Sequence, residues 1–373
     1  MRICREVLQV KMKVLFVVSG IGYGDAMREH CNIHELKEKH SSVRVMVAGY
    51  DNSYNYFKEK YDTIRISGYK LPGESMKVNA FMFALKNILL PWYWFFGTLK
   101  VRLQAYNFIP DVVVTDFEPA GISLAEVLGK KCIVVFGFDP LLYEEYRKEH
   151  KVSVKMKVQA AYFEKLYNLA EVVVIPTFKI EKEQHLLYTY VNPIVRIKPS
   201  ELPSEKDLMK AFGLKKKPII VVLGGSNFGK KLAWNINLIA GETNEEFIIF
   251  GGDLDFKLNQ NVKYVKFTDD LLKYMKVAKG VITLAGQKTL SEAMVYDKAV
   301  LSFPIQEHIE QVLNAYALKD LIMVSHDSSI NCVRKSLKEF LIRIPEMTEK
   351  VKKRKFVGDG SKQFLKVFEM ITK

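Results

Sequence analysis

Cysteine is scarce in this chain, with four residues in 373 and no CxxC pair among them. This scarcity argues against a disulfide framework or a zinc knuckle and is typical of proteins from a reducing compartment. A cleavable secretory signal is also lacking at the N-terminus. Residues 1–11 differ in character from the apolar run that follows, so we interpret them as an extension without a structural role.

Acidic residues are outnumbered by basic ones, 42 to 56, which gives a formal net charge of +14. A basic balance indicates anionic partners, which include nucleic acids, acidic lipid surfaces and phosphorylated substrates. The basic residues are spread along the chain and no recognised nucleic-acid motif accompanies them, so no nucleic-acid partner is expected. The hydrophobic content of 49% is that of a globular protein, and the length allows two domains.

The most apolar stretch lacks acidic residues altogether, from residue 79 to residue 108. A membrane-spanning helix needs about 20 uninterrupted apolar residues, and Lys86 and Pro91 interrupt this stretch. Its aromatic cluster around Trp92 and its cations favour a segment lying on an anionic membrane surface through residues 79–102. A core helix of the N-terminal domain is the alternative.

A short β-branched run, residues 13–19, predicts a buried strand that leads into a glycine-rich turn and a helix. Gly22 and Gly24 of this turn allow close backbone approach to a ligand at the helix N-terminus. The spacing is GxGxG and lacks the third glycine of the dinucleotide fingerprint, which argues against a dehydrogenase. Asp25 follows the turn, either as a helix N-cap or as a base whose pKa burial would raise.

A second acidic pair follows a later strand. Asp116 and Glu118 come directly after the apolar run 112–115, where open α/β sheets place their ligands. Either carboxylate could orient a substrate or serve as an alternative base to Asp25. Capping of the helix that begins near Gly121 is the simpler interpretation.

The pattern restarts after a linker-like segment, residues 198–217, that is rich in Lys, Pro and charge. Residues 219–223 predict a strand, and the turn that follows contains Gly225 and Ser226. Backbone N–H groups and a hydroxyl in such a turn suit a phosphate, although a simple tight turn is the alternative. The two halves therefore begin alike, which predicts a twofold Rossmann-like organisation.

The most informative stretch is residues 280–317, where strand, glycine turn and helix occur twice in succession. Gly286 precedes the first helix, so the unpaired N–H groups of its first turn suit an anion. Glu292 lies within the first turns of the same helix, where a carboxylate suits a pair of sugar hydroxyls. An ordinary βαβ unit with a surface glutamate is the alternative.

Taken in order, six features of this stretch resemble the donor-sugar signature of GT-B glycosyltransferases: Gly286, Thr289, Glu292, Pro304, Gln311 and the pair Asn314-Ala315. The nearest branch contains the bacterial lipid-linked GlcNAc transferase of peptidoglycan synthesis and the UDP-glycosyltransferases. The resemblance implies an α/β fold of the GT-B type, with two Rossmann-like domains facing a central cleft. It divides the chain into an acceptor-binding domain at 12–198, a nucleotide-sugar-binding domain at 199–357 and a returning C-terminal helix at 358–373.

The resemblance implies transfer of a sugar from a nucleotide diphosphate, expected to be UDP, to a hydroxyl of a lipid or lipid-linked acceptor. Asp25 stands where relatives often carry a histidine base, a departure from the family pattern, and Glu118 is the alternative base. A base that deprotonates the attacking acceptor implies inversion. The residues expected around the donor are Gly22, Gly24, Gly225, Ser226, Phe267, Gly286, Gln287, Thr289, Glu292, Glu310 and Gln311.

This scheme requires neither a metal nor another cofactor, because helix dipoles and lysines can neutralise the leaving diphosphate. Asp253 and Asp255 have DxD spacing but follow two glycines as an ordinary loop would. The expected location is cytoplasmic, peripheral on the inner face of the cell membrane. Two alternatives are a UDP-sugar epimerase of the same fold and a non-catalytic nucleotide-sugar-binding relative that has lost the base.

Overall fold

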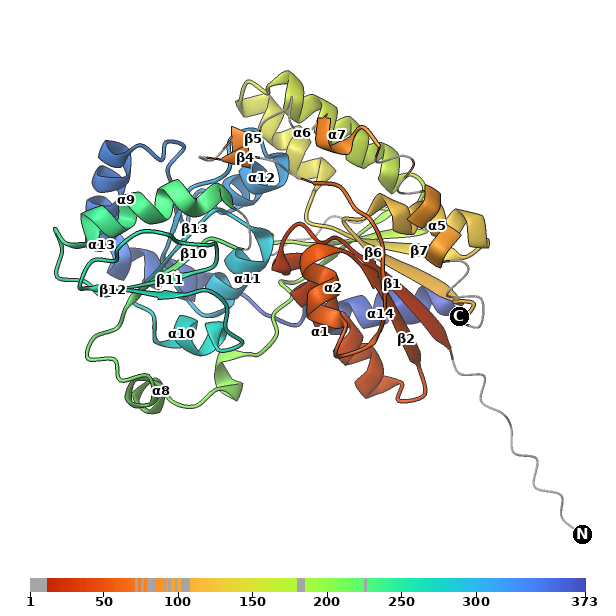
Figure 1. Cartoon of the computed structure of the whole chain (residues 1–373), viewed down its shortest axis with the longest axis horizontal. Coiled ribbons are helices and arrows are strands. Elements are labelled where there is room, and N and C mark those ends of the chain that lie inside the picture. Colours follow the sequence, from red (N-terminus) through yellow and green to blue (C-terminus); the bar gives the residue numbers. More distant parts are fainter. Residues whose placement is uncertain are drawn as a thin grey trace, which may run out of the picture.

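A computed structural model describes the chain at residues 12–70, 73–74, 77–78, 85–89, 92, 95–97, 99–101, 108–179, 185–224 and 227–373. Two separate parallel sheets dominate it, one in each half of the chain (Figure 1). The expected pair of α/β units is confirmed. Gly225 and Ser226, and half of the apolar segment 79–102, lie outside the described residues.

The first sheet has the strand order β3-β2-β1-β6-β7-β8-β9, and all its neighbouring strands pair in parallel. Its apolar strands are buried on both faces, so successive side chains of β1 enter two different cores. The strands are β1 (Lys13–Val18), β2 (Arg44–Gly49), β3 (Asp62–Arg65), β6 (Val112–Asp116), β7 (Lys131–Val135), β8 (Val172–Pro176) and β9 (Tyr188–Val191).

The second sheet has the order β12-β11-β10-β13-β14-β15, again with parallel neighbours. In both sheets the first strand in sequence lies near the middle, so the order reverses beside β1 and β10. Ligand crevices form at the carboxyl edge of such a reversal. The strands are β10 (Ile219–Val222), β11 (Phe247–Phe250), β12 (Val262–Val265), β13 (Gly280–Thr283), β14 (Val300–Ser302) and β15 (Met323–Val324), and a separate antiparallel pair joins β4 (Gly73–Glu74) to β5 (Lys77–Val78).

Helices cover the sheets in both halves (Figure 1). In the first half they are α1 (Tyr23–Lys39), α2 (Asp51–Phe57), α5 (Pro119–Leu128), α6 (Pro140–Glu149) and α7 (Val154–Tyr167). In the second half they are α8 (Glu205–Ala211), α9 (Lys230–Ala240), α10 (Leu271–Val277), α11 (Gln287–Val295), α12 (Ile309–Ala317) and α13 (Ile330–Arg354), with 3-10 turns at Pro199–Glu201 and Asn227–Gly229.

The last helix, α14 (Gly360–Thr372), lies beside α1 and the first sheet although it follows α13 in the chain (Figure 1). Phe364 and Phe368 are buried in the same core as the first strand. Asn192 donates a hydrogen bond of 2.6 Å to Asp359 just before the helix begins. The chain therefore crosses between the halves twice, once near residue 195 and once near residue 358.

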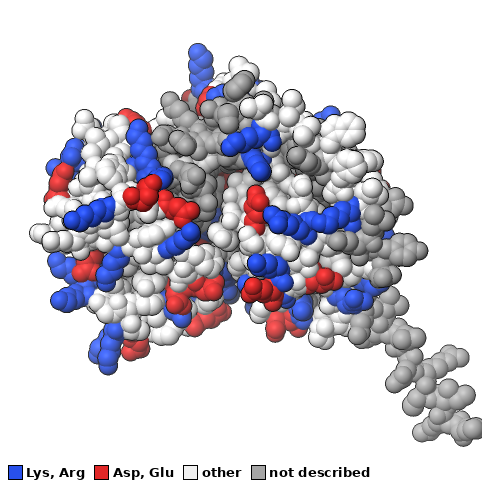
Figure 2. Space-filling model, viewed as in Figure 1, with Lys and Arg blue, Asp and Glu red and all other residues white. Residues whose placement is uncertain are grey.

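Charged side chains of both signs are interspersed on the face shown in Figure 2, and lysines and arginines occur on both halves. Within the described residues, no helix combines the length and apolarity that crossing a membrane would require.

Candidate active site between the two sheets

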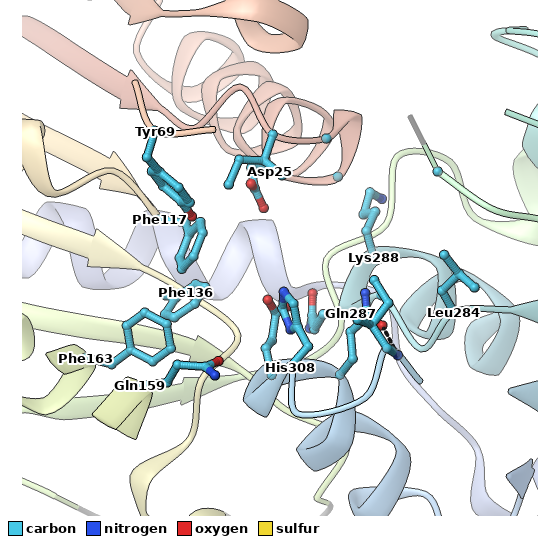
Figure 3. Close-up of a pocket in the computed structure, with 18 of the residues that line it drawn as sticks. Asp25, Tyr69, Phe117, Phe136, Gln159, Phe163, Leu284, Gln287, Lys288 and His308 are labelled. Carbon is cyan, nitrogen blue, oxygen red and sulfur yellow. Dashed lines mark hydrogen bonds between the residues drawn. The ribbon is translucent and has the colours of Figure 1, made fainter. Parts of the chain in front are cut away.

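A cavity of about 890 Å³ lies between the two halves, where loops after strands of both sheets meet (Figure 3). The first half contributes the turn after β1, the β6–α5 loop and α7. The second half contributes the turn after β13, the start of α11 and the β14–α12 loop. Both sheets thus present their carboxyl edges to one space, as the reversal of strand order predicts.

The glycine turn after β1 belongs to the first half and lines the cavity. Gly20 is required by close packing, because a Cβ there would lie 1.9 Å from the carbonyl oxygen of Tyr50. Gly22 and Gly24 line the cavity, as expected, and Gly22 is the residue before α1. Asp25 lies in the first turn of α1, and its carboxylate points into the cavity (Figure 3).

Arg28, one turn further along α1, is almost completely buried beneath Asp25. Its guanidinium donates to both carboxylate oxygens of Asp116, at 2.6 and 2.7 Å. The same group donates to Oδ1 of Asp25 at 3.0 Å. It also donates at 3.1 Å to Oε1 of Gln287, which belongs to the second half. Asp116 is the last residue of β6, so one side chain joins a strand end to both walls of the cavity.

Carboxyl groups crowd around this one cation. Burial raises the pKa of Asp25 well above its ordinary value, and the nearby Asp116 adds to this, whereas Arg28 opposes it. Burial likewise raises the pKa of Glu29 and that of Glu310. A carboxylate with a raised pKa is a stronger base than an ordinary one, which is the property that the proposed role of Asp25 requires.

Glu118 lines the cavity but is only 2% exposed, and it caps α5. Its Oε1 accepts a hydrogen bond of 3.2 Å from the backbone N–H of Ala120, and its carbonyl oxygen accepts one of 2.6 Å from the Thr115 hydroxyl. The structure therefore contains the helix cap that was the simpler interpretation of this residue. A role as alternative base stays a prediction.

On the opposite wall α11 begins at Gln287. Gly286 directly precedes it, and no side chain caps the N-terminus of this helix. Gly286 and Thr289 line the cavity, as does Gly224 of the turn after β10. Gln287 also lines the cavity, but its amide is already engaged: it accepts from Arg28 and donates to the carbonyl oxygen of Pro176 at 3.4 Å. The structure thus brings the anion-suited helix start opposite Asp25.

Glu292 is not among the residues that line the cavity. It is 1% exposed and accepts from the ammonium of Lys288 at 2.7 Å and from Nε of Arg196 at 3.4 Å. These two cations lower its pKa, although burial alone would raise it. The expected position beside ribose hydroxyls is not found in this arrangement, because Lys288 occupies the cavity wall one turn before Glu292. Its role as a ribose ligand stays a prediction that requires Lys288 to move.

The start of α12 completes the second wall. Glu310 lines the cavity and reaches the first half, since a Cβ on Gly137 would lie 3.0 Å from its Oε1. Gln311 also lines the cavity, and its Oε1 accepts from the backbone N–H of Ile305 at 2.9 Å, which fixes the loop before the helix. Phe267 is not among the residues that line the cavity; it is 47% exposed, and its ring packs against that of Tyr23, which does line it, at 5.1 Å between centroids.

His308, directly before α12, also lies on the cavity wall (Figure 3). Its Nδ1 is buried and has no hydrogen-bond partner elsewhere in the described part of the chain. Burial lowers the pKa of this imidazole to about 4, so it is neutral at pH 7. A neutral imidazole has a free lone pair that can accept a proton, although its lowered pKa makes His308 a weaker base than an ordinary histidine.

The part of the cavity inside the first half is aromatic (Figure 3). Phe117 stacks on Phe136 with 4.3 Å between ring centroids, Phe136 meets Phe163 at 5.0 Å, and Tyr69 meets Phe117 at 5.5 Å. Exposed apolar residues of α7, among them Val158, continue this lining toward solvent. Such a lining suits an apolar ligand group rather than a charged one.

The two halves are held together across the cavity by polar contacts. Gln159 of α7 donates to the carbonyl oxygen of Glu307 at 2.8 Å and accepts from the N–H of Ile309 at 3.2 Å. Lys155 pairs with the Glu307 carboxylate at 2.8 Å. Lys288 donates to the carbonyl oxygen of Ile194 at 3.1 Å. The two halves therefore contact each other both along α7 and at the crossing near residue 195.

The Glycosyl transferase family 1 profile matches residues 12–345. The chain belongs to this glycosyltransferase family. A glycosyltransferase of Methanosarcina acetivorans is 23% identical over 395 residues, covering 96% of this chain and 98% of the relative. Another, from Methanopyrus kandleri, is 26% identical over 222 residues, covering 55% of this chain and 59% of the relative.

Solved structures with the same fold include the spinosyn rhamnosyltransferase SpnG, at a TM-score of 0.68, 14% identity and coverage of 96% of this chain and 100% of that chain. For MurG of Acinetobacter baumannii the TM-score is 0.59 and the identity 15%, with coverage of 96% of this chain and 99% of that chain. For UGT89C1 of Arabidopsis thaliana complexed with UDP the TM-score is 0.63 and the identity 13%, with coverage of 97% of this chain and 99% of that chain. The predicted GT-B fold is confirmed, and the protein is a glycosyltransferase of that type.

Three features of this glycosyltransferase site escaped the sequence analysis. They are the buried Arg28, the imidazole of His308 and the aromatic lining. Arg28 carried a weak signal, because residues three apart on a helix face the same side and Asp25 was already singled out. His308 lies two residues before the predicted Glu310, but no spacing rule marked it. The aromatic side chains carried no signal, since they come from loops and helices far apart in the sequence.

Proposed function

We propose that this glycosyltransferase moves a sugar from a nucleoside diphosphate donor, expected to be UDP-linked, to a hydroxyl of a lipid or lipid-linked acceptor. The observation that carries the proposal is the composition of one cavity. An uncapped helix N-terminus lies on one wall, a carboxylate with a raised pKa lies on the opposite wall, and an aromatic recess adjoins it. Donor, base and acceptor each find a chemically suitable surface.

On the donor side, the backbone of Gly286 to Thr289 would bind the diphosphate, because N–H groups at a helix start favour anions. Gly225 and Ser226 are expected to hold the same diphosphate from the turn after β10. Glu310 and Gln311 stand where the donor sugar's hydroxyls are expected. That UGT89C1 is seen with UDP and SpnG with thymidine diphosphate supports a nucleoside diphosphate in this cleft.

In the reaction, Asp25 takes the proton of the acceptor hydroxyl as its oxygen attacks the anomeric carbon of the donor sugar. The bond from that carbon to the diphosphate oxygen breaks, and the diphosphate leaves with the electron pair. Attack opposite the leaving group inverts the anomeric configuration. The start of α11 stabilises the charge that develops on the diphosphate. No step in this scheme requires a metal ion.

The lipid character of the acceptor is inferred from two surfaces. The aromatic recess suits an apolar group beside the attacking hydroxyl. Outside it, the described residues of segment 79–102 expose large apolar side chains, including Trp92 at 63%, Phe95 at 63% and Ile88 at 70%. Lys86 and Lys100 of the same segment are exposed as well. Aromatic and basic side chains together suit the surface of an anionic bilayer, which supports the proposal of a peripheral location on the inner face of the cell membrane.

UDP binding measured by calorimetry tests the donor site. Wild type is expected to bind at micromolar affinity, on the order of −8 kcal/mol. Gly286→Val is a sharp probe, because a Cβ at Gly286 meets no atom within 4 Å and its backbone is extended. The variant should fold and lose UDP binding. Failure of wild type to bind UDP or any other nucleotide would refute the donor site.

A turnover assay with a UDP-sugar separates the alternatives. An epimerase would convert a UDP-sugar with no acceptor present, and a non-catalytic relative would bind UDP without turnover and without any effect of Asp25→Ala. Family membership favours a transferase over both. Appearance of a glycosylated lipid only when membrane extract accompanies the UDP-sugar would distinguish transfer from epimerisation.

A further inference from the structure

Arg28 contacts both Asp25, the proposed base, and the cavity wall that is proposed to bind the donor. It contacts Asp25 and Asp116 in the first half and Gln287 in the second, and its side chain is only 1% exposed. We propose that Arg28 is a positioning residue that couples the placement of α11 to the orientation of the Asp25 carboxylate. This inference rests on the proposed function, in which α11 binds the donor and Asp25 is the base.

The geometry calls for an arginine. Two parallel N–H groups, from Nε and Nη2, meet the two oxygens of Asp116 and fix the plane of the guanidinium. With that plane fixed, the remaining hydrogen on Nη2 is directed at Asp25 and Nη1 at Gln287. A lysine ammonium is a point charge with no such fork, so it cannot hold these directions simultaneously.

Gln287 carries the coupling to the donor. It is the first residue of α11 and follows Gly286, where the diphosphate is expected. Its amide bridges Arg28 and the carbonyl oxygen of Pro176 at the end of β8, so both partners lie in the first half. The start of α11 and the Asp25 carboxylate therefore contact the same guanidinium, so loss of the contact on Nη1 removes one of the contacts that hold Arg28 against Asp25.

The charge around Arg28 explains why its position matters. Asp25, Asp116, Glu29 and Glu310 all influence this one guanidinium or one another, and burial raises the pKa of three of them. Arg28 is the larger of two groups that oppose the raised pKa of Asp25, the other being the Ser19 hydroxyl. A change in its distance from Asp25 therefore alters how readily that carboxylate takes a proton.

Kinetics of sugar transfer as a function of pH tests the coupling, with Arg28→Lys, Gln287→Ala and, as control, Lys319→Met. Lys319 pairs with Glu149 across the same two halves at 2.9 Å but is exposed and remote from Arg28. Arg28→Lys should lower kcat about tenfold, as a misplaced catalytic group does, and move the acid limb of the pH profile to higher pH. Gln287→Ala should lower kcat and move the acid limb in the same direction, both measured with the UDP-sugar at saturation so that a change in donor affinity does not enter the comparison. Lys319→Met should change neither.

An ion pair with only a structural role predicts a different pattern. Arg28→Lys and Gln287→Ala would then lower the Tm but leave kcat and the pH profile as in wild type, which would overturn the coupling while transfer itself persisted. If Arg28→Lys does not fold, the result for Gln287→Ala decides alone. If wild type neither binds UDP nor transfers sugar, the proposed function fails and the coupling falls with it.

Discussion

The ammonium of Lys288 lies 2.7 Å from the carboxylate of Glu292, one turn further along α11. Lys288 lines the cavity and Glu292 does not. Arg196, from the crossing between the halves, approaches the same carboxylate. The residue expected to bind the ribose is therefore held in a buried ion cluster at the joint between the two halves.

Removing the carboxylate of Glu292 should destabilise the fold. Glu292→Gln leaves two buried cations without their anion, for which a loss of about 3 kcal/mol is typical. The pKa of Glu292 is lowered in the folded protein. Its contribution to the free energy of unfolding is therefore present above the pKa of the unfolded carboxyl, about 4.3, and is lost as pH falls through the pKa of the folded protein. Urea unfolding of wild type and variant at pH 7 and pH 4 should show the difference shrinking at acid pH.

The matched control is the double variant Lys288→Met/Glu292→Gln, which removes one cation together with the anion. It should recover part of the stability that Glu292→Gln loses. Equal stability of Glu292→Gln and wild type at pH 7 would mean that the cluster contributes nothing to folding.

Asp25 should show the opposite dependence on pH. Its pKa is raised in the folded protein. Its contribution to the free energy of unfolding is therefore complete below the pKa of the unfolded carboxyl, about 4, and is lost as pH rises through the pKa of the folded protein. Asp25→Asn can still accept the hydrogen bond from Arg28, so the variant should have a higher Tm than wild type at pH 7 and an equal one near pH 3. Calorimetric melting at the two pH values measures this, and a lower Tm at pH 7 would contradict it.

Tyr162 tests the acceptor recess with little risk to folding. It lines the cavity and is 42% exposed, unlike the buried Phe163 beside it. Tyr162→Ala should raise the acceptor KM about tenfold through loss of aromatic contact, with the donor KM unchanged. Initial rates with each substrate varied in turn distinguish the two, and a change confined to the donor KM would place the acceptor elsewhere.

Trp92 and Phe95 test the membrane surface. The double variant Trp92→Ala/Phe95→Ala should weaken binding to vesicles of anionic lipid about tenfold or more, measured by co-sedimentation. Ile342→Ala is the matched control, because Ile342 is an apolar residue 80% exposed on α13 in the other half. Equal binding by the double variant and the control would exclude this surface as the membrane contact.

Much of the fold was predictable from local pattern. Short β-branched runs bounded by glycine gave the strands, since each signal lies within a few residues. The glycine turns before α1 and α11 were found in the same way, and so was the position of Asp25. Sequence spacing alone, however, could not show whether Asp25 caps the helix or faces a cavity.

The electrostatic network of the site was not predictable. Arg28 is separated from Asp116 by 88 residues and from Gln287 by 259, and only the packing of the two halves brings them together. The burial of Glu292 had one readable sign, its spacing of four residues from Lys288, which favours an ion pair on a helix. The contact with Arg196 depends on the path of the crossing segment, which local pattern does not determine.

The most direct test of the account is sugar transfer by Asp25→Asn at a UDP-sugar concentration that saturates both proteins, with His308→Gln as the comparison. The account predicts that Asp25→Asn binds UDP as wild type does and transfers sugar about 100-fold more slowly, the usual range for loss of a general base, while His308→Gln keeps most of the activity. Full activity of Asp25→Asn, with activity lost instead in His308→Gln, would contradict the account and make the neutral imidazole the base.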